Sequence, residues 1–391
     1  MNYKRIKHAC YIGYVTQAVV NNFLPLLFLT LQRSFDVSLE QLSLIVTLNF
    51  GVQLLTDLTS PLYVDKIGYW PSMRLAHLLS AVGLAGLWFF TELFPEPFTG
   101  VLVSVVIYAV GGGLLEVLVS PIIESCPFEH KEAEMSLLHS FYCWGHVAVV
   151  LVSTAFFTVF GLDNWRVMAC LWALVPLYNL YNFCTLPVPY ITEQRGGMKV
   201  AALLKSGTFW RLFLMMLCAG ASEQGMSQWA SAFAESSLGV SKTLGDLLGP
   251  CCFAVMMGLS RMFFGKFGDR LDLRRFMNAS SVLCIMSYLL ATLTSAPWLG
   301  LLGCMLCGLS VGIMWPGSFS IAAASIRGGG TAMFALLALA GDVGCSSGPA
   351  VVGFAAENSG GDLKTGLLYA IAFPTLLLAL NLMGRAKEQK E

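Results

Sequence analysis

Long apolar stretches follow one another along the whole chain, separated by short breaks rich in charged residues, proline or glycine. A transmembrane helix needs about 20 predominantly apolar residues, and each stretch reaches that length. They cover residues 8–32, 39–63, 73–94, 98–123, 134–160, 165–187, 208–235, 243–266, 275–295, 297–322, 329–356 and 364–384. The pattern therefore predicts an all-α integral membrane protein with twelve transmembrane helices.

The longest polar interval separates the sixth stretch from the seventh and carries Glu193, Arg195, Lys199 and Lys205. We expect an N-terminal six-helix bundle at residues 1–187, a cytoplasmic linker at 188–206 and a C-terminal six-helix bundle at 207–391. A short basic turn follows the second stretch of each half, at residues 61–68 and 265–275. The repeated turn indicates two related halves.

Composition agrees with the membrane prediction. The 391 residues are 56% hydrophobic and 12% charged, which is more apolar surface than one soluble core can hide. Net charge is zero, so nothing points to nucleic acid as a partner. Most of the 12 cysteines lie within apolar stretches, where they act as small hydrophobic residues. Because no metal or disulfide spacing is visible, we expect no metal and no other cofactor.

The distribution of basic residues predicts the orientation. With the N-terminus inside, eighteen Lys and Arg residues fall on the inner side, and four, Arg33, Arg166, Lys242 and Lys364, on the outer side. Cytoplasmic loops carry the excess of basic residues, so both termini and the linker are expected in the cytoplasm. No small-residue cleavage site follows the first basic residues, which favours a retained first span over a removed leader. We expect a monomer in the cytoplasmic membrane of a prokaryotic cell.

Twelve spans in two halves and the turn Gly265-x-x-x-Asp269-Arg270 resemble the major facilitator superfamily of secondary transporters. The resemblance covers nearly the whole chain, although Pro61 replaces the glycine in the first copy of the turn, which contains Asp65. It implies a fold of two pseudo-symmetric six-helix bundles. In that family the turn latches the cytoplasmic ends of neighbouring helices, which implies a gating role for Asp65 and Asp269, and Arg270 belongs to the same turn. Ordinary basic loops that obey the topology are the alternative.

Asp57 and Arg261 extend the expected gate into the adjoining spans. Asp57 shares a helix face with Asn49 and Gln53, so it has two possible roles. One is to pair with a basic residue of the cytoplasmic gate, such as Arg261. The other is to line a solute cavity, and the sequence does not decide between them.

A narrower resemblance joins residues 111–121, 138–141 and 313–319 to the fucose/galactose/glucose:proton symporter branch. In that branch a glutamate in the fourth span and an acid in the first span, four positions before a proline, are associated with proton coupling. Glu116 matches the glutamate, and burial favours the protonated form that a carrier needs. Asn21, four positions before Pro25, occupies the other position and cannot titrate. The alternatives are a structural Glu116 that bonds a neighbouring helix, and transport that is not driven by protons.

The seventh predicted span combines Glu223, Gln224, Gln228 and Trp229. Polar side chains inside a span are costly and are expected to face the protein interior. Sugars are bound by amide and carboxylate groups together with an aromatic ring under their apolar face, so this segment predicts solute binding. The alternative is helix packing through Gly225, with Trp229 at the outer membrane interface.

Other spans add candidates for solute binding. His139, Tyr142 and His146 share one face of the fifth span, where the two histidines are about 10.5 Å apart along the axis, too far for one metal ion. We expect them to bond solute or Glu116, with a core role for His146 as the alternative. The remaining candidates are Gln17, Asn21, Asn22, Asn49, Gln53, Trp315 and Asp342. Pro316 predicts a break in the tenth span, and the glycines around Asp342 predict a flexible gating helix.

The sequence thus predicts a secondary transporter that moves a small polar solute, most plausibly a sugar or sugar-like compound, by alternating access and in symport with protons. Another small organic solute, export, antiport, or a sodium-driven or uncoupled mechanism is the alternative. An integral membrane enzyme or receptor is disfavoured, because no catalytic cluster or phosphate-cradling loop is visible.

Overall fold

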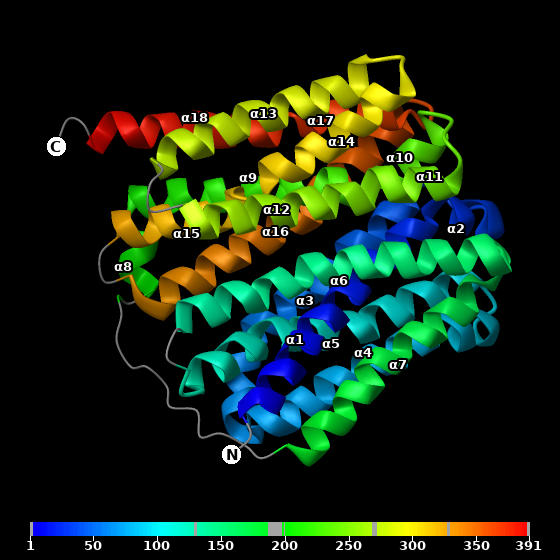
Figure 1. Cartoon of the computed structure of the whole chain (residues 1–391), viewed down its shortest axis with the longest axis horizontal. Helices are drawn as coiled ribbons and strands as arrows, with labels where there is room; N and C mark the ends of the chain where they lie inside the picture. Colours follow the sequence, from blue (N-terminus) through cyan, green and yellow to red (C-terminus); the bar gives the residue numbers. More distant parts are fainter. Residues whose placement is uncertain are drawn as a thin grey trace. The chain divides into compact units, whose positions relative to one another are not determined.

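The computed structural model describes residues 3–128, 131–186, 198, 200–267, 272–326 and 329–388, and all regular structure in these ranges is helical (Figure 1). The all-α prediction is confirmed. The chain divides into two compact units, residues 1–193 and 194–391, here called the first and the second unit.

The first unit contains α1 (Tyr3–Asn22), η1 (Leu24–Leu27), α2 (Phe28–Phe35), α3 (Leu39–Ile67), α4 (Tyr69–Leu93), α5 (Pro97–Ser125), α6 (Lys131–Phe160), η2 (Leu162–Asn164) and α7 (Trp165–Thr185). Within it, α5 packs against α1, α3, α4 and α6, and α7 packs against α4. The helix that carries Glu116 therefore lies at the centre of this unit.

The second unit contains α8 (Val200–Leu204), α9 (Gly207–Ser227), α10 (Ala230–Ser236), α11 (Lys242–Asp246), η3 (Leu247–Cys251), α12 (Cys252–Phe267), α13 (Leu273–Leu293), α14 (Pro297–Val311), α15 (Met314–Ser325), α16 (Gly330–Asn358), α17 (Leu363–Ala370) and α18 (Ala372–Glu388). In this unit α9 packs against α16, and α14 packs against α9, α12 and α13.

Eleven segments of the described chain are long and apolar enough to cross a membrane, and they coincide with eleven of the predicted spans. The remaining prediction, residues 208–235, is helical as α9 and α10. This segment is not among the eleven, and the end of α9 carries Glu223 and Gln224 in place of apolar residues. The protein is a multi-pass membrane protein.

Close helix packing in the first unit depends on the glycine triplet of α5. A Cβ atom on Gly111 would lie 2.4 Å from Ser80 Oγ of α4, and one on Gly113 would lie 2.9 Å from Thr56 Cβ of α3. Small residues allow membrane helices to approach this closely. The triplet thus sets the distance from α5 to its neighbours one turn before Glu116.

Glycines also join α9 to α16 in the second unit. A Cβ atom on Gly344 would lie 2.0 Å from the carbonyl oxygen of Leu217, and one on Gly348 would lie 2.4 Å from that of Ala221. The structure has α16 as one continuous helix with Pro349 inside it, and the gating role predicted for this helix stays a prediction. Its glycines are contact points between two tightly packed helices.

Several of the predicted spans are not continuous α-helices, and three of the breaks fall next to candidate site residues. α1 ends at Asn22 ahead of Pro25, α9 gives way to α10 at residues 228–229, and α14 gives way to α15 at 312–313. The break predicted at Pro316 is thus present, slightly earlier in the chain. A proline ring excludes the helical hydrogen bond to the carbonyl four residues back, which for Pro316 is that of Gly312.

Candidate functional site

A cluster of buried amide side chains joins α1 to α3 in the first unit. Asn21 Oδ1 accepts hydrogen bonds from Asn49 Nδ2 at 2.9 Å and from Gln53 Nε2 at 2.8 Å. Gln53 Nε2 also lies 2.9 Å from Asn49 Oδ1. The three side chains are at most 5% exposed. Residues predicted separately on two spans therefore form one connected group.

Tyr142 extends this group to α6. Its hydroxyl accepts a hydrogen bond from Asn22 Nδ2 at 3.2 Å and lies 3.5 Å from Asn21 Nδ2. Asn22 Nδ2 also donates to the backbone carbonyl of Ala18 at 2.9 Å. We call Asn21, Asn22, Asn49, Gln53 and Tyr142 the amide cluster.

One acceptor of the amide cluster has no partner. Gln53 is 1% exposed, and its Oε1 atom makes no hydrogen bond within the described chain. Leaving a buried polar group unsatisfied costs about 1–3 kcal/mol, so natural structures rarely retain one without a reason. A hydroxyl or N–H donor from a bound molecule would satisfy this carbonyl oxygen.

Glu116 lies on α5, beside the amide cluster, and is half-buried. Its Oε2 atom accepts a hydrogen bond from Gln17 Nε2 of α1 at 2.7 Å. No Lys or Arg is paired with it among the residues that the structure describes. A carboxyl group held by a neutral amide can take up and release a proton without breaking an ion pair.

The other candidates on α6 are arranged differently from Tyr142. The His139 ring lies 5.1 Å from the Tyr14 ring of α1, centroid to centroid, and His146 is buried. Their predicted roles in binding solute or Glu116 stay predictions.

In the second unit, Glu223 is held in a buried polar chain. Arg261 Nη2 of α12 lies 3.2 Å from Glu223 Oε2, which forms an ion pair. Gln224 Nε2 donates to Glu223 Oε1 at 3.2 Å, and Gln228 Nε2 donates to Gln224 Oε1 at 2.8 Å. The charges of Glu223 and Arg261 compensate each other, so this row of hydrogen-bonded side chains carries no net charge.

Of the two tryptophans predicted to bind solute, Trp229 is packed inside the second unit and Trp315 is half-buried. Trp229 is fully buried, and its Nε1 atom donates to the carbonyl oxygen of Pro349 at 3.0 Å. It therefore lies neither at a lipid interface nor in a position to offer an open face. The Trp315 ring packs on Gly341, where a Cβ atom would come within 2.2 Å of it, next to the buried Asp342.

The predicted cytoplasmic gate is largely outside what can be described. Asp269 and Arg270 lie outside the described residues, and so does the side chain of Asp65. Asp57 is half-buried on α3, and Arg261 is bound to Glu223. The gating roles of these five residues remain predictions.

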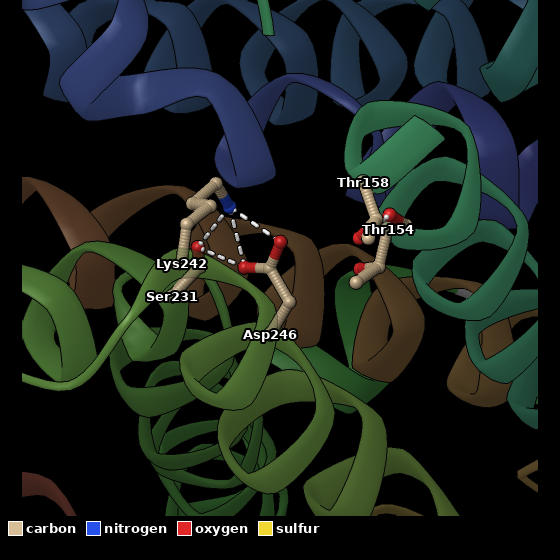
Figure 2. Close-up of polar contacts among 5 residues, drawn as sticks. All are labelled: Thr154, Thr158, Ser231, Lys242 and Asp246. Carbon is tan, nitrogen blue, oxygen red and sulfur yellow. Dashed lines mark hydrogen bonds and ion pairs between the residues drawn. The ribbon is translucent and has the colours of Figure 1, made fainter. Parts of the chain in front are cut away.

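Two polar groups were missed by the sequence interpretation. Lys242 Nζ lies 2.5 and 2.6 Å from the carboxylate oxygens of Asp246 and 2.9 Å from Ser231 Oγ, tying α10 to α11 (Figure 2). The spacing of Lys242 and Asp246 by four residues was the available signal. The threonines in Figure 2 belong to α6, where Thr158 Oγ1 donates to the Thr154 carbonyl at 2.8 Å.

The second missed group is His77 in the first unit. Its Nδ1 atom lies 2.7 Å from the carbonyl oxygen of Met73, and its Nε2 atom 2.7 Å from Asn179 Nδ2. Asn179 also donates to the carbonyl of Ala9 at 2.8 Å. These bonds hold a neutral imidazole between α4, α7 and α1.

In the described part of the chain, no group of three or more His, Cys, Asp or Glu residues is arranged to hold a metal ion. Two units of membrane-spanning helices with polar side chains buried in their interior are typical of secondary transporters. The chain belongs to the Major Facilitator Superfamily, whose family model matches residues 10–349 and 238–388. Among curated proteins, no sequence matches it significantly.

Solved structures with the same fold cover nearly the whole chain. A D-xylose-proton symporter is 14% identical over 98% of this chain and 97% of its own, with a TM-score of 0.81. A bacterial homologue of the human lysosomal transporter Spinster is 14% identical over 98% and 97%, with a TM-score of 0.80. The Escherichia coli fucose:proton symporter is 16% identical over 96% and 98%, with a TM-score of 0.64. At these identities the likeness shows the fold alone.

Proposed function

We propose that the protein is a secondary active transporter for a small neutral polyhydroxylated solute, a sugar or a sugar-like compound, moved by alternating access in symport with protons. The observation that carries the proposal is the amide cluster of the first unit with its unpartnered Gln53 carbonyl oxygen.

The chemistry of the candidate residues favours a neutral solute. Amides offer both donors and acceptors, which suits hydroxyl groups, whereas a carboxylate or phosphate is recognised by Arg or Lys. The amide cluster contains no basic side chain, and Arg261 of the second unit is already opposed by Glu223. The D-xylose and fucose symporters show that this fold can carry sugars with protons.

The coupling residue in this proposal is Glu116. It has no ion-pair partner in the described chain, and its helix α5 packs directly on α1, α3 and α6, which carry the amide cluster. The Glu116→Gln variant mimics the protonated form permanently. Exchange of solute for solute should survive in this variant, because exchange needs only the loaded carrier to reorient, while accumulation driven by a pH gradient should disappear. If the Glu116→Gln variant accumulated solute fully, Glu116 would be excluded as the proton carrier, and a sodium-driven or uncoupled mechanism would be favoured.

The solute can be found with purified protein in detergent. A thermal-shift screen of pentoses, hexoses, nucleosides and amino acids identifies binders, because a ligand of the native state raises stability by mass action. Uptake of the best binder into proteoliposomes, recovered chemically unchanged, then tests transport against an enzymatic reaction.

A matched pair of variants tests the site itself. Gln53→Leu removes the unpartnered carbonyl oxygen together with the Nε2 donor to Asn21 and Asn49. Thr56→Val on the same helix removes a hydroxyl whose hydrogen bond stays within α3. Losing a hydrogen bond between neutral groups costs about 0.5–1.5 kcal/mol, or roughly a twofold to tenfold loss of affinity. We expect that loss in Gln53→Leu and not in Thr56→Val. Equal affinities in both variants would exclude Gln53 from the site.

A small zwitterion such as an amino acid is the second candidate solute. It is favoured by the Glu223–Arg261 pair, whose arginine side chain is 22% exposed. A carboxylate and an ammonium group could replace the two partners of this pair. Stabilisation by amino acids, without stabilisation by any sugar or nucleoside, would decide for this candidate.

A further inference from the structure

α1 and α5 are joined along a seam whose contacts run in antiparallel register. Tyr14 Oη lies 3.2 Å from Ser120 Oγ, and Gln17 Nε2 lies 2.7 Å from Glu116 Oε2. One turn further, a Cβ atom on Gly112 would lie 3.2 Å from a methyl group of Val20. The Gln17–Glu116 hydrogen bond is therefore held in place from both sides.

Gln17 uses only half of its amide group in this seam. It is 4% exposed, and its Oε1 atom makes no hydrogen bond within the described chain, while its Nε2 atom bonds Glu116. The arrangement suits an ionised Glu116, which can only accept hydrogen bonds. A protonated Glu116 can itself donate a hydrogen bond. On Gln17, the acceptor available for that bond is the Oε1 atom.

We propose that Gln17 is a positioning residue: the orientation of its amide group follows the protonation state of Glu116, and this changes the hydrogen bonds that α1 can make. When Glu116 takes up a proton, the amide of Gln17 turns, so that its carbonyl oxygen accepts the new hydrogen bond and its NH₂ group is released. The side of Gln17 that faces away from Glu116 then changes from an acceptor to a donor. No bond other than hydrogen bonds changes, and the proton stays on Glu116.

The consequence reaches the amide cluster through α1. Gln17 and Asn21 are four residues apart and so lie on one face of the helix. Asn21 receives hydrogen bonds from both Asn49 and Gln53. A change of donor and acceptor one turn from Asn21 would alter which hydroxyl group of a solute fits there. This role of Gln17 rests on the proposed coupling through Glu116.

Other titratable groups surround Glu116 and must be separated from it in any pH experiment. Near its level, the helices packed on α5 carry Tyr14 of α1, Asp57 of α3, His77 of α4, and His139, Tyr142 and His146 of α6. Of these, Tyr14 is bonded to Ser120, and His77 is bonded to Met73 and Asn179. A difference spectrum against Glu116→Gln isolates the carboxyl of Glu116 from all of them.

The experiment is a pH titration of the purified protein by infrared difference spectroscopy, without any solute. The variant is Gln17→Met, which keeps the length of the side chain but has neither donor nor acceptor of comparable strength. Tyr14→Phe is the matched control, because it removes a neighbouring hydrogen bond of the same seam. Monodisperse elution in detergent confirms that each variant is folded, and Gln17→Asn, which is too short to reach, replaces Gln17→Met if that variant aggregates.

Two readouts are expected to change in Gln17→Met and not in Tyr14→Phe. The C=O stretch of protonated Glu116 should move to higher frequency, because the acid loses its acceptor. The pH of half-titration should rise, because the ionised form of Glu116 loses the hydrogen bond from Gln17, and a hydrogen bond to a charged group is roughly twice as strong as one between neutral groups.

An unchanged stretching frequency in Gln17→Met would show that Gln17 does not bond the acid form, and it would overturn the proposal. Since the titration needs no transport, this failure is distinct from that of the coupling proposal. If only the coupling proposal failed, the Gln17→Met variant would still shift the Glu116 band, and the Glu116→Gln variant would accumulate solute normally.

Discussion

The buried pair of Glu223 and Arg261 makes an asymmetric prediction about stability. In Glu223→Gln the guanidinium of Arg261 loses the negative charge of Glu223 and cannot give up its proton. In Arg261→Met the remaining carboxyl can take up a proton and become neutral. We therefore expect Glu223→Gln to be the more harmful change at neutral pH, although it is the smaller change in shape.

The magnitude follows from how deeply the pair is buried. Removing one partner of a fully buried ion pair costs about 3–5 kcal/mol. The side chains here are 9% exposed for Glu223 and 22% exposed for Arg261, so solvent relieves part of that cost. We expect a loss of about 2–3 kcal/mol in Glu223→Gln and about 1–2 kcal/mol in Arg261→Met.

The double variant completes the test. With both charges gone, Gln224 can still donate to the amide at position 223, so the Glu223→Gln/Arg261→Met protein should be more stable than Glu223→Gln alone. If the double variant is about as stable as Arg261→Met, the interaction energy between the two sites is about 2–3 kcal/mol, at the upper end of the range for residues in direct contact.

The assay is thermal unfolding of purified protein in detergent, read as a rank order because unfolding of such proteins is commonly irreversible. The expected order is wild type, then the double variant together with Arg261→Met, then Glu223→Gln. Lowering the pH should not weaken Arg261→Met further, since its carboxyl is already able to protonate. Strictly additive effects of the two single changes would refute the reasoning.

Two further predictions concern orientation and packing. Reporter fusions at Gly197 and after Glu391 should be cytoplasmic and a fusion after Asp163 periplasmic, as the excess of inner basic residues requires; a periplasmic Gly197 would refute the topology. Asn179→Leu leaves the Nε2 atom of the buried His77 without its donor, so the free energy of unfolding should fall by about 1–3 kcal/mol. Adding His77→Phe to this variant should restore part of that stability. If it restores none, the imidazole is not the source of the loss.

Much of the candidate site could be predicted residue by residue but not as contacts. Gln17, Asn21, Asn49, Gln53 and Glu116 were each visible as polar residues within apolar stretches, because lipid makes such residues conspicuous. Which of them meet depends on how each helix is rotated about its axis, and a lone polar residue on a span does not determine that rotation. The packing of Trp229 and of the α16 glycines against neighbouring helices could not be predicted for the same reason.

The sequence by itself determined the number, limits and expected orientation of the spans. The length of an apolar stretch and the charges beside it are local properties, and they act directly on how the segment inserts into the bilayer. Tertiary structure decided which side chains share a hydrogen bond. Asn21 and Gln53 are 32 residues apart, and Gln17 and Glu116 are 99 apart, and their meeting depends on glycine contacts that set the distance between helices. In a membrane the backbone groups of a helix are hydrogen-bonded within that helix. The specificity of the fold therefore lies in the contacts of side chains and small residues. These contacts join residues far apart in the sequence, so a local sequence pattern does not predict them.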